Sequence, residues 1–272
     1  FAVTKGLYGF HVMFTSKDGH KTSSFNGTSC VTRDLDRELI TCGSVDRLLR
    51  ESVEQTDPQG LSGRFVGDLI LTPDVFADFL GLYLDTFLRD SALIAGTSRL
   101  KDKLDQQVSA PCITVHDLPR SAELASNHFL TPDGFLAQDH TIIDRGTLKT
   151  YLLSLYGARK TGLARALNVG TSCIVEAGDR GIDDIVDGVE RGIILGRFSG
   201  GNPGESGDVS GVAKNSYYVE DGQVRYPVTE TMISSNLLDL FANAGAVSSE
   251  RVDFGSTILP WVRCTGVTIS GK

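Results

Sequence analysis

Residues 218–231 read YVEDGQVRYPVTET, and this stretch does most to decide the fold class. Asp221 and Gly222 are typical of a tight β-turn, because both residue types tolerate the positive φ angles that such a turn needs. Strand-like runs at residues 216–219 and 224–228 flank this turn. The stretch therefore predicts a β-hairpin, and strand-like runs at residues 256–259 and 266–269 predict more strands after it.

Similar signals occur earlier in the sequence. Asp18-Gly19 and Asp144-Arg145-Gly146 predict two further hairpin turns. Thr72-Pro73-Asp74 predicts the start of a helix, since Thr caps a helix, Pro suits its first turn and Asp favours its positive end. Because strands cluster in hairpins and helices are few, the sequence predicts an α+β fold, an antiparallel, hairpin-rich sheet domain with a few packed helices.

Three other segments give more specific expectations. Apolar residues recur at helical spacing between Asp34 and Val53, with Asp34 as the expected N-cap. Residues 182–193 predict a second amphipathic helix on the same grounds. Residues 196–211 (GRFSGGNPGESGDVSG) are so rich in glycine that we expect a mobile or irregular loop.

The composition argues against several classes of partner. The formal net charge is −8, and a surface of that sign repels phosphate backbones, so no nucleic-acid partner is expected. No run of 18 apolar residues is present, so no membrane association is expected. The five cysteines are widely spaced without a CxxC pair, which favours reduced thiols in a cytoplasmic protein over a disulfide framework or a zinc ribbon.

The sequence contains none of the common catalytic motifs. No two of the five histidines lie three to five residues apart, the spacing that directs two imidazoles from one helix face toward a zinc ion. Isolated side chains leave weaker alternatives open. These are dispersed zinc ligands at His116, His128 and Asp139, acid–base carboxylates at Asp144, Asp183-Asp184, Glu205 and Asp208, and thiol nucleophiles at Cys112 and Cys264.

The ordered motifs of the C-terminal third resemble the end of TldD/PmbA proteins, a family once called modulators of DNA gyrase. The resemblance rests on residues 208–210, 218–231, 233–240 and 254–260, and on residues 147–163 after Asp133-Gly134. It implies that residues 1–272 form the family's C-terminal domain, and that the family's N-terminal α/β domain is absent from this sequence.

TldD-like members of this family resemble zinc peptidases with HExxxH on a helix and a Cys before a Gly near the C-terminus, whereas PmbA-like members lack the metal ligands. Aligning the helix after Pro73 with that motif places Asp78, Phe79 and Tyr83 at the first His, the Glu and the second His. Phe254 falls at the Cys position. Zinc needs deprotonated N, S or O ligands, so we expect a degenerate site without metal.

The resemblance therefore implies a non-catalytic, metal-free subunit of a TldD/TldE-type peptidase, with no cofactor of its own. Its expected partners are a TldD-like metallopeptidase chain and a peptide or unfolded protein bound by strand addition. Contacts with them are expected at Gly201, Glu205, Asp208 and Tyr226. A peptide-binding scaffold and a free-standing hydrolase remain alternatives, and self-association of the isolated chain stays open.

Overall fold

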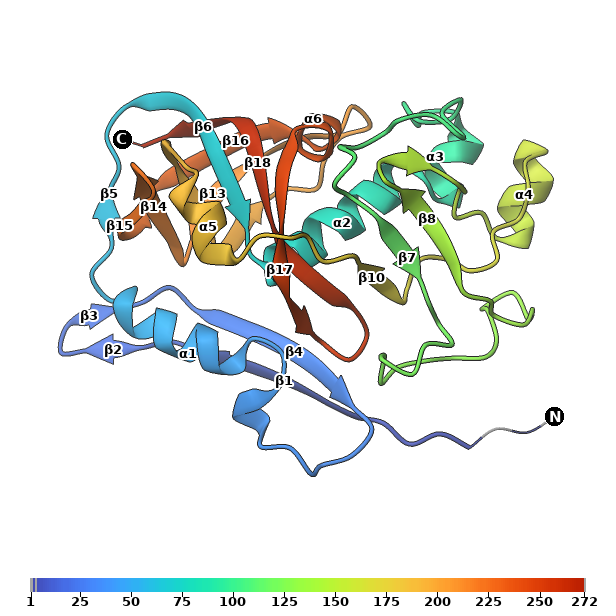
Figure 1. Ribbon diagram of the computed structural model, residues 1–272, viewed down its shortest axis with the longest axis horizontal. Helices are drawn as coiled ribbons and strands as arrows, with labels where there is room; N and C mark the ends of the chain where they lie inside the picture. The colour runs from blue at the N-terminus through green and yellow to red at the C-terminus, as the bar shows by residue number, and fades with distance from the viewer. Residues whose placement is uncertain (1, 3, 272) are drawn as a thin grey trace.

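The computed structural model describes residues 2 and 4–271, and a large mixed β-sheet forms its centre (Figure 1). Neighbouring strands along the main path are, in order, β5 (Gln59–Gly60), β15 (Gln223–Thr229), β14 (Ser216–Glu220), β11 (Arg191–Leu195), β6 (Arg64–Leu71), β18 (Ile258–Ser270), β10 (Cys173–Val175), β7 (Val115–Asp117), β8 (His140–Asp144) and β9 (Thr147–Leu148). A branch leaves β18 through β16 (Thr231–Asn236), β13 (Asp208–Lys214) and β12 (Arg197–Gly200), and β17 (Ala244–Asp253) also pairs with β18.

The predicted α+β class is confirmed, although the sheet is mixed and not purely antiparallel. Hairpin partners such as β14 and β15 are antiparallel, whereas β6 with β11, β10 with β18 and β5 with β15 are parallel. The hairpin predicted at residues 218–231 is present. Glu220 pairs with Gln223, and Asp221 and Gly222 adopt positive φ angles of 51° and 73°.

The central helix α2 (Pro73–Phe87) begins where the sequence predicts it, after Thr72 and with Pro73 in its first turn. It packs against the sheet and buries an aromatic stripe that includes Phe76, Phe79 and Tyr83. Each such side chain contributes roughly 1.5–3 kcal/mol by leaving water. The other helices that Figure 1 labels around the sheet are α3 (Asp90–Ala95), α4 (Leu155–Thr161), α5 (Ile182–Asp187) and α6 (Leu237–Ala242).

Residues 8–54 form a separate unit, which we call the arm, along the lower side of the molecule in Figure 1. Its ribbon consists of β1 (Tyr8–Phe14) and β4 (Asn26–Thr32), which pair with each other over their full lengths and with no other described strand. The short pair β2 (Lys17–Asp18) and β3 (Lys21–Thr22) forms its tip, and α1 (Val45–Glu54) packs on β4.

Three sequence expectations were wrong in detail. Asp34 is not an N-cap, because Gly43, with a φ of 55°, separates a short 3₁₀ turn (Leu39–Thr41) from α1. The helix expected over residues 182–193 ends at Asp187, and Ile193 instead lies in β11.

The third correction concerns residues 196–211, which form β12 and β13 and not one irregular loop. Gly200 pairs with Gly211 across these strands, and a Cβ at Gly211 would lie 2.6 Å from the ring of Phe198. These glycines therefore allow close packing around an aromatic ring, and only residues 201–207 connect the strands as a loop.

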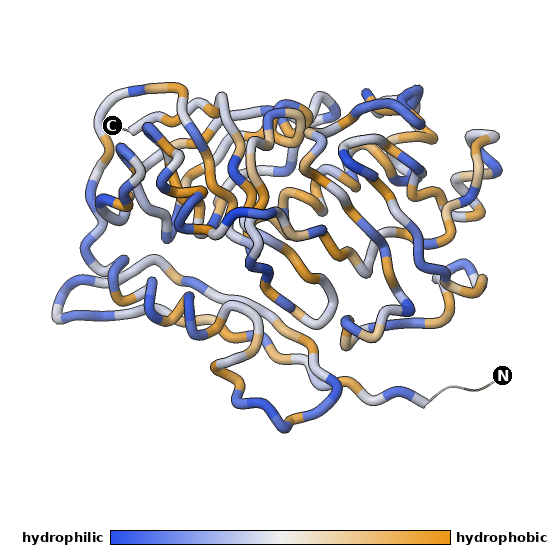
Figure 2. The backbone as a smooth tube through the Cα atoms, in the orientation of Figure 1, coloured by the Kyte–Doolittle hydropathy of each residue, from blue (hydrophilic) through white to orange (hydrophobic). Residues whose placement is uncertain are grey.

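Hydropathy follows this architecture. Figure 2 shows that hydrophobic residues gather in the centre of the body, whereas hydrophilic residues lie in outer turns such as the β2–β3 hairpin. Among the described residues, no helix is both long enough and apolar enough to span a bilayer.

Candidate functional site

An open pocket of about 350 Å³ lies where the arm meets the body. Elements far apart in the sequence build it: β1 and β4 from the arm, the first half of α2, β12, and the turn between β17 and β18. Asp78 and Phe254 both line this pocket, so the structure brings together two of the four positions expected from the degenerate motif. Its other lining residues are His11, Asn26, Gly27, Thr28, Ser29, Asp74, Val75, Ala77, Gly196, Arg197, Phe198, Ser256 and Thr257.

The other two positions, Phe79 and Tyr83, lie in the core and not in the pocket. Phe79 packs edge-on against Phe198, with ring centroids 5.2 Å apart. The Tyr83 ring stacks on Phe241 at 4.3 Å, and its hydroxyl donates a hydrogen bond to the Val108 carbonyl at 3.0 Å. Burial also raises the pKa of Tyr83, so this side chain is a neutral donor that supports packing.

A second carboxylate of α2, that of Asp74 one turn earlier, lines the pocket together with Asp78. Its two carboxylate oxygens are already occupied. Thr28 donates to Oδ1 at 2.9 Å, while Ser44 and Arg47 donate to Oδ2 at 2.7 and 2.5 Å. Asp74 therefore ties the arm to α2. The sequence reasoning missed it, although its i,i+4 spacing from Asp78 was a visible signal.

Asp78 differs, because it makes no hydrogen bond or ion pair that the structure shows among the described residues. Its carboxylate is exposed to the pocket. Partial burial, and secondarily the negative charge of Asp74, raises the pKa of Asp78, while Arg197 opposes the shift. The Arg197 guanidinium lies over the Phe25 ring at 3.6 Å and donates to the Phe25 carbonyl at 3.3 Å. The Asp78 carboxylate therefore faces the pocket without a partner, while Arg197, which lines the same pocket, contacts Phe25.

Asn26 is the second polar group without a partner in this pocket. Its side chain is 2% exposed, and its Oδ1 accepts a hydrogen bond from the Gly27 amide at 3.1 Å. Its Nδ2 is buried and has no partner among the described residues. A buried donor without a partner costs roughly 1–3 kcal/mol, so the pocket holds an unused hydrogen-bond donor.

The residues of this pocket do not fit a zinc site. Phe254 has no lone pair to donate, and the oxygens of Asp74 already accept three hydrogen bonds. Within residues 2 and 4–271, no three His, Cys, Asp or Glu side chains form a group that could hold a metal ion. Of the dispersed candidates, His116 bonds Thr141 and Glu176, and Asp139 accepts from the Arg120 amide.

The four expected contact residues occupy two places. Gly201 and Glu205 are exposed in the β12–β13 loop, and Asp208 begins β13. Hydrogen bonds from Asn236 and Ser206 lower the pKa of Asp208, which remains exposed. Tyr226 lies in β15, away from that loop in the strand order, and packs against Tyr218 with ring centroids 5.3 Å apart.

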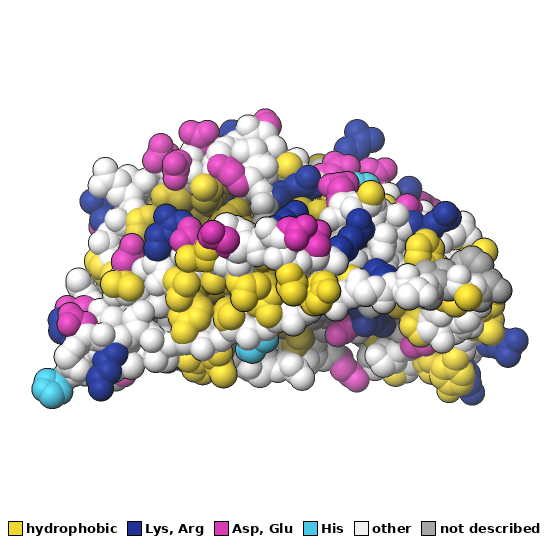
Figure 3. Space-filling view, turned by 90° about the horizontal axis from the view of Figure 1, so that it is seen from below, with side chains coloured by type: hydrophobic (Ala, Val, Ile, Leu, Met, Phe, Trp, Pro, Cys, Tyr) yellow, Lys and Arg dark blue, Asp and Glu magenta, His cyan; other side chains and the backbone are white. Residues whose placement is uncertain are grey.

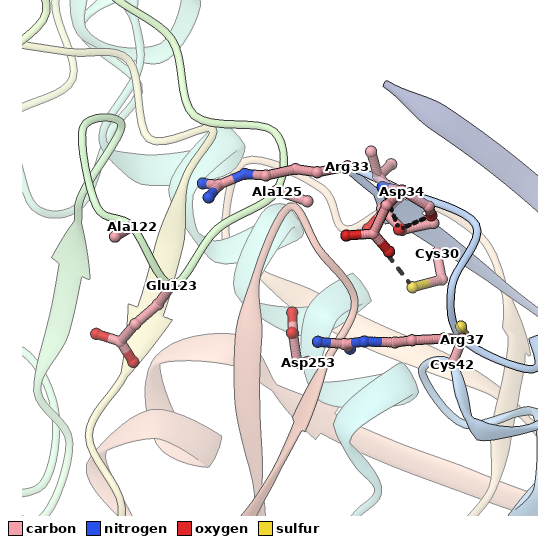
Figure 4. Close-up of a pocket in the computed structure, with 11 residues that line it drawn as sticks. Cys30, Arg33, Asp34, Arg37, Cys42, Ala122, Glu123, Ala125 and Asp253 are labelled. Atoms are coloured by element: carbon pink, nitrogen blue, oxygen red, sulfur yellow. Dashed lines mark hydrogen bonds between the residues drawn. The ribbon is translucent and has the colours of Figure 1, made fainter. Parts of the chain in front are cut away.

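A smaller pocket of about 200 Å³ lies at the C-terminal end of β4, and Figure 4 shows its lining. Cys30 and Cys42 lie near each other there, and the charged side chains of Arg33 and Arg37 also line the pocket. Burial raises the pKa of Cys30 to about 11, and Cys42 and Asp253 add to the shift. The Cys30 thiol is therefore protonated at neutral pH and is a poor nucleophile.

The remaining single-residue candidates form no site. Cys264 is buried, and burial raises its pKa to about 12. Asp183 and Asp184 lie in the first turn of α5, where negative charge suits the helix dipole. Asp183 lines an open groove of about 670 Å³ between α1, α5 and β15, whose lining also includes Trp261.

A mixed sheet, a buried aromatic helix and an arm that meets them at an open pocket define the α+β architecture of this chain. Residues 63–271 match the family described as PmbA/TldA metallopeptidase C-terminal domain, and the chain belongs to this family. The resemblance seen in the sequence motifs is thereby confirmed.

Relatives and solved structures agree with this assignment. The chain is 26% identical over 226 residues to metalloprotease PmbA of Escherichia coli O157:H7. This match covers 80% of the chain and 49% of the relative. It is 23% identical over 271 residues to a metalloprotease PmbA homolog of Buchnera aphidicola, covering 91% and 60%.

Among solved structures, a proposed modulator of DNA gyrase from Bacteroides thetaiotaomicron superimposes with a TM-score of 0.83 at 23% identity, covering 98% of this chain and 60% of the other. TldE from Thermococcus kodakarensis gives 0.77 at 20% identity, covering 97% and 63%. These likenesses establish the fold. The chain spans about half to three fifths of the length of these curated relatives.

Proposed function

We propose that this chain acts as the metal-free, non-catalytic subunit of a two-component zinc peptidase, in which a TldD-like chain supplies the metal. The main support is Phe254, which shares the arm–body pocket with Asp78. A phenyl ring cannot replace a thiolate ligand, and Phe79, at the expected position of the general base, has no proton acceptor. The proposal therefore rests on the chemistry of the side chains that are present.

The apolar surface of the arm supports a protein partner. Leu49 and Val53 lie one turn apart on α1, and their exposed fractions are 38% and 63%. The segment before α1 adds three more exposed aliphatic side chains, Leu35, Leu39 and Ile40. Figure 3 shows hydrophobic side chains gathered in a band across the face that carries the arm. Exposed apolar patches of this kind mark protein interfaces, and we assign this one to the TldD-like chain.

Two free strand edges support peptide binding by strand addition. Among the described strands, β1 pairs only with β4, and β12 pairs only with β13. By contrast, β13 has partners on both sides, as has β15 over its last residues. An extended peptide would thus find unpaired backbone groups along β12, and along β15 only before Val228, where β5 begins to pair with it.

Metal analysis combined with a peptidase assay tests the proposal. We expect less than 0.1 zinc per chain, no cleavage by the chain alone, and cleavage that increases when a TldD-like metallopeptidase chain is added. Stoichiometric zinc with cleavage by the isolated chain would instead support a free-standing hydrolase. Peptide binding without any gain in cleavage would support a scaffold.

A matched pair of variants tests the interface. Val53→Gln removes an apolar side chain from the arm, whereas Val66→Gln removes one of similar exposure, 63% against 67%, from β6. We expect Val53→Gln to weaken association with the TldD-like chain at least fivefold in a pull-down titration, and Val66→Gln to leave it unchanged. Equal effects of the two variants on association would show that the apolar surface of the arm is not part of the interface.

A further inference from the structure

The arm–body pocket contains one free carboxylate and one unused amide donor. We infer that it binds the free amino terminus of a peptide, with Asp78 accepting from the α-ammonium group and Asn26 donating to the first carbonyl oxygen. The inference rests on the proposed function, since it assigns a ligand class to the same pocket. It extends that function from a general affinity for peptides to recognition of one chain end.

The charges of the pocket favour a cationic ligand. The carboxylate of Asp78 lies one helical turn from that of Asp74, and the described residues offer it no ion pair. Arg197, which also lines the pocket, is instead stacked on Phe25 and donates to the Phe25 carbonyl. An ammonium group would supply the missing positive charge through a charge-assisted hydrogen bond, whereas phosphate or a carboxyl terminus would be repelled.

Asn26 distinguishes an amino terminus from an isolated ammonium group. The bond from the Gly27 amide to its Oδ1 fixes the orientation of the side chain, so Nδ2 is the atom left without a partner. An α-ammonium group has a carbonyl oxygen on the same residue, which could accept from Nδ2. A lysine ammonium has no acceptor at that short distance, and its binding would leave Asn26 unsatisfied.

The remaining walls suit the side chain of the first residue. Val75, Phe198 and Phe254 provide apolar surface beside the two polar groups. A volume of about 350 Å³ lies at the lower end of the range typical of small-ligand sites, which is enough for a chain end but not for a folded segment. Because Phe254 stands where a metal ligand would be needed, the pocket can bind a peptide end without cleaving it.

Fluorescence polarisation tests this inference with the full chain and two hexapeptides that begin with leucine and carry a dye at the carboxyl end. One peptide has a free amino terminus and the other is N-acetylated. We expect the free peptide to bind at least tenfold more tightly. Asp78→Asn should reduce this preference to less than twofold. Asp85→Asn, which alters an exposed carboxylate elsewhere on α2 that pairs with Arg89, should leave the preference unchanged.

Equal affinity for the two peptides would overturn the inference, as would no binding of the free peptide at millimolar concentration or an unchanged preference in Asp78→Asn. A third peptide, N-acetylated but with lysine at the second position, separates the two sources of ammonium. If it bound as tightly as the free peptide, the site would recognise lysine side chains and the inference would fail. Activation of a TldD-like chain is measured separately, so the proposed function can survive this failure.

Discussion

Arg47 of α1 forms an ion pair with Asp74 in the first turn of α2, with Nη2 and Oδ2 2.5 Å apart. Both side chains are mostly buried, with exposed fractions of 22% and 16%. Arg47 also bonds Glu51 within α1, and Asp74 accepts from Thr28 of β4. This cluster of charges is therefore the polar joint between the arm and the body, directly beside the pocket.

Removing the cation from this joint should destabilise the protein markedly. Arg47→Met leaves the Asp74 carboxylate partly buried without its ion partner, so we expect the free energy of unfolding to fall by about 2 kcal/mol. Arg50→Met is the matched control on the same helix, because Arg50 pairs with Asp46 in an exposed position and should cost less than about 0.5 kcal/mol. Urea unfolding monitored by circular dichroism measures both values, and similar losses would contradict a structural role of the joint.

A second ion pair predicts a dependence of stability on pH. Asp133 accepts two hydrogen bonds from Arg165, at 2.8 and 2.7 Å, and one from the Leu155 amide at 2.8 Å. Hydrogen bonding to Arg165 in particular holds the pKa of Asp133 well below its usual range. A depressed folded pKa gives stability that is fully present above the unfolded pKa, near 4, and is lost as the pH falls toward the folded pKa.

We therefore expect Asp133→Asn to lower the free energy of unfolding by about 2 kcal/mol at pH 7, with the difference from the parent shrinking progressively below about pH 4. Denaturant titrations between pH 2.5 and pH 7 measure this difference. Asp57→Asn, which breaks an exposed pair with Lys21, should change stability by less than about 0.5 kcal/mol throughout. A difference for Asp133→Asn that is constant with pH would refute the assignment.

Sequence patterns predicted those features whose signals are local. The turn at Asp221-Gly222 and the helix start at Pro73 depend on a few adjacent residues, and both are present. The pocket depends instead on contacts between distant segments. Asn26 and Asp78 come together only because β4 packs beside α2, and no local spacing indicates that. Glycine was also misread at residues 196–211, where Gly200 and Gly211 make room for Phe198 in a regular hairpin.

Thiol reactivity gives a third prediction. The sequence has five cysteines, of which Cys112 is exposed and the other four are buried. Burial raises the pKa of Cys30 and Cys264 to about 11 and 12, and also raises that of Cys173. Burial raises the pKa of Cys112 as well, but its exposed side chain is open to reagents, whereas the other four are not. Ellman's reagent at pH 8 should therefore modify one thiol in the native protein and the other four only after unfolding.

Cys112→Ser should abolish the fast reaction and leave the slow equivalents unchanged, which assigns the exposed thiol. Two or more thiols that react rapidly in the native protein would show that the arm opens. Cys30 and Cys42 would then be the first to become accessible, because both line the pocket between the arm and the loop that carries Glu123.

The fourth prediction concerns Gly255, at the turn where the body meets the arm. Its φ is 78°, and a Cβ there would lie 1.7 Å from the Val31 carbonyl oxygen. Gly266 has almost the same φ, 77°, but no atom lies within 4 Å of its Cβ position. Gly266→Ala should therefore cost about 1 kcal/mol through backbone strain alone, whereas Gly255→Ala should cost at least about 2 kcal/mol more, measured by urea unfolding. The clash in Gly255→Ala is with backbone, so no side-chain rotation relieves it.

The hydrogen bond from the Val31 amide to the Phe254 carbonyl, 3.0 Å long, must lengthen as the two segments separate. Equal costs for the two substitutions would mean that the arm yields freely at this point and does not fix the position of Phe254 in the pocket.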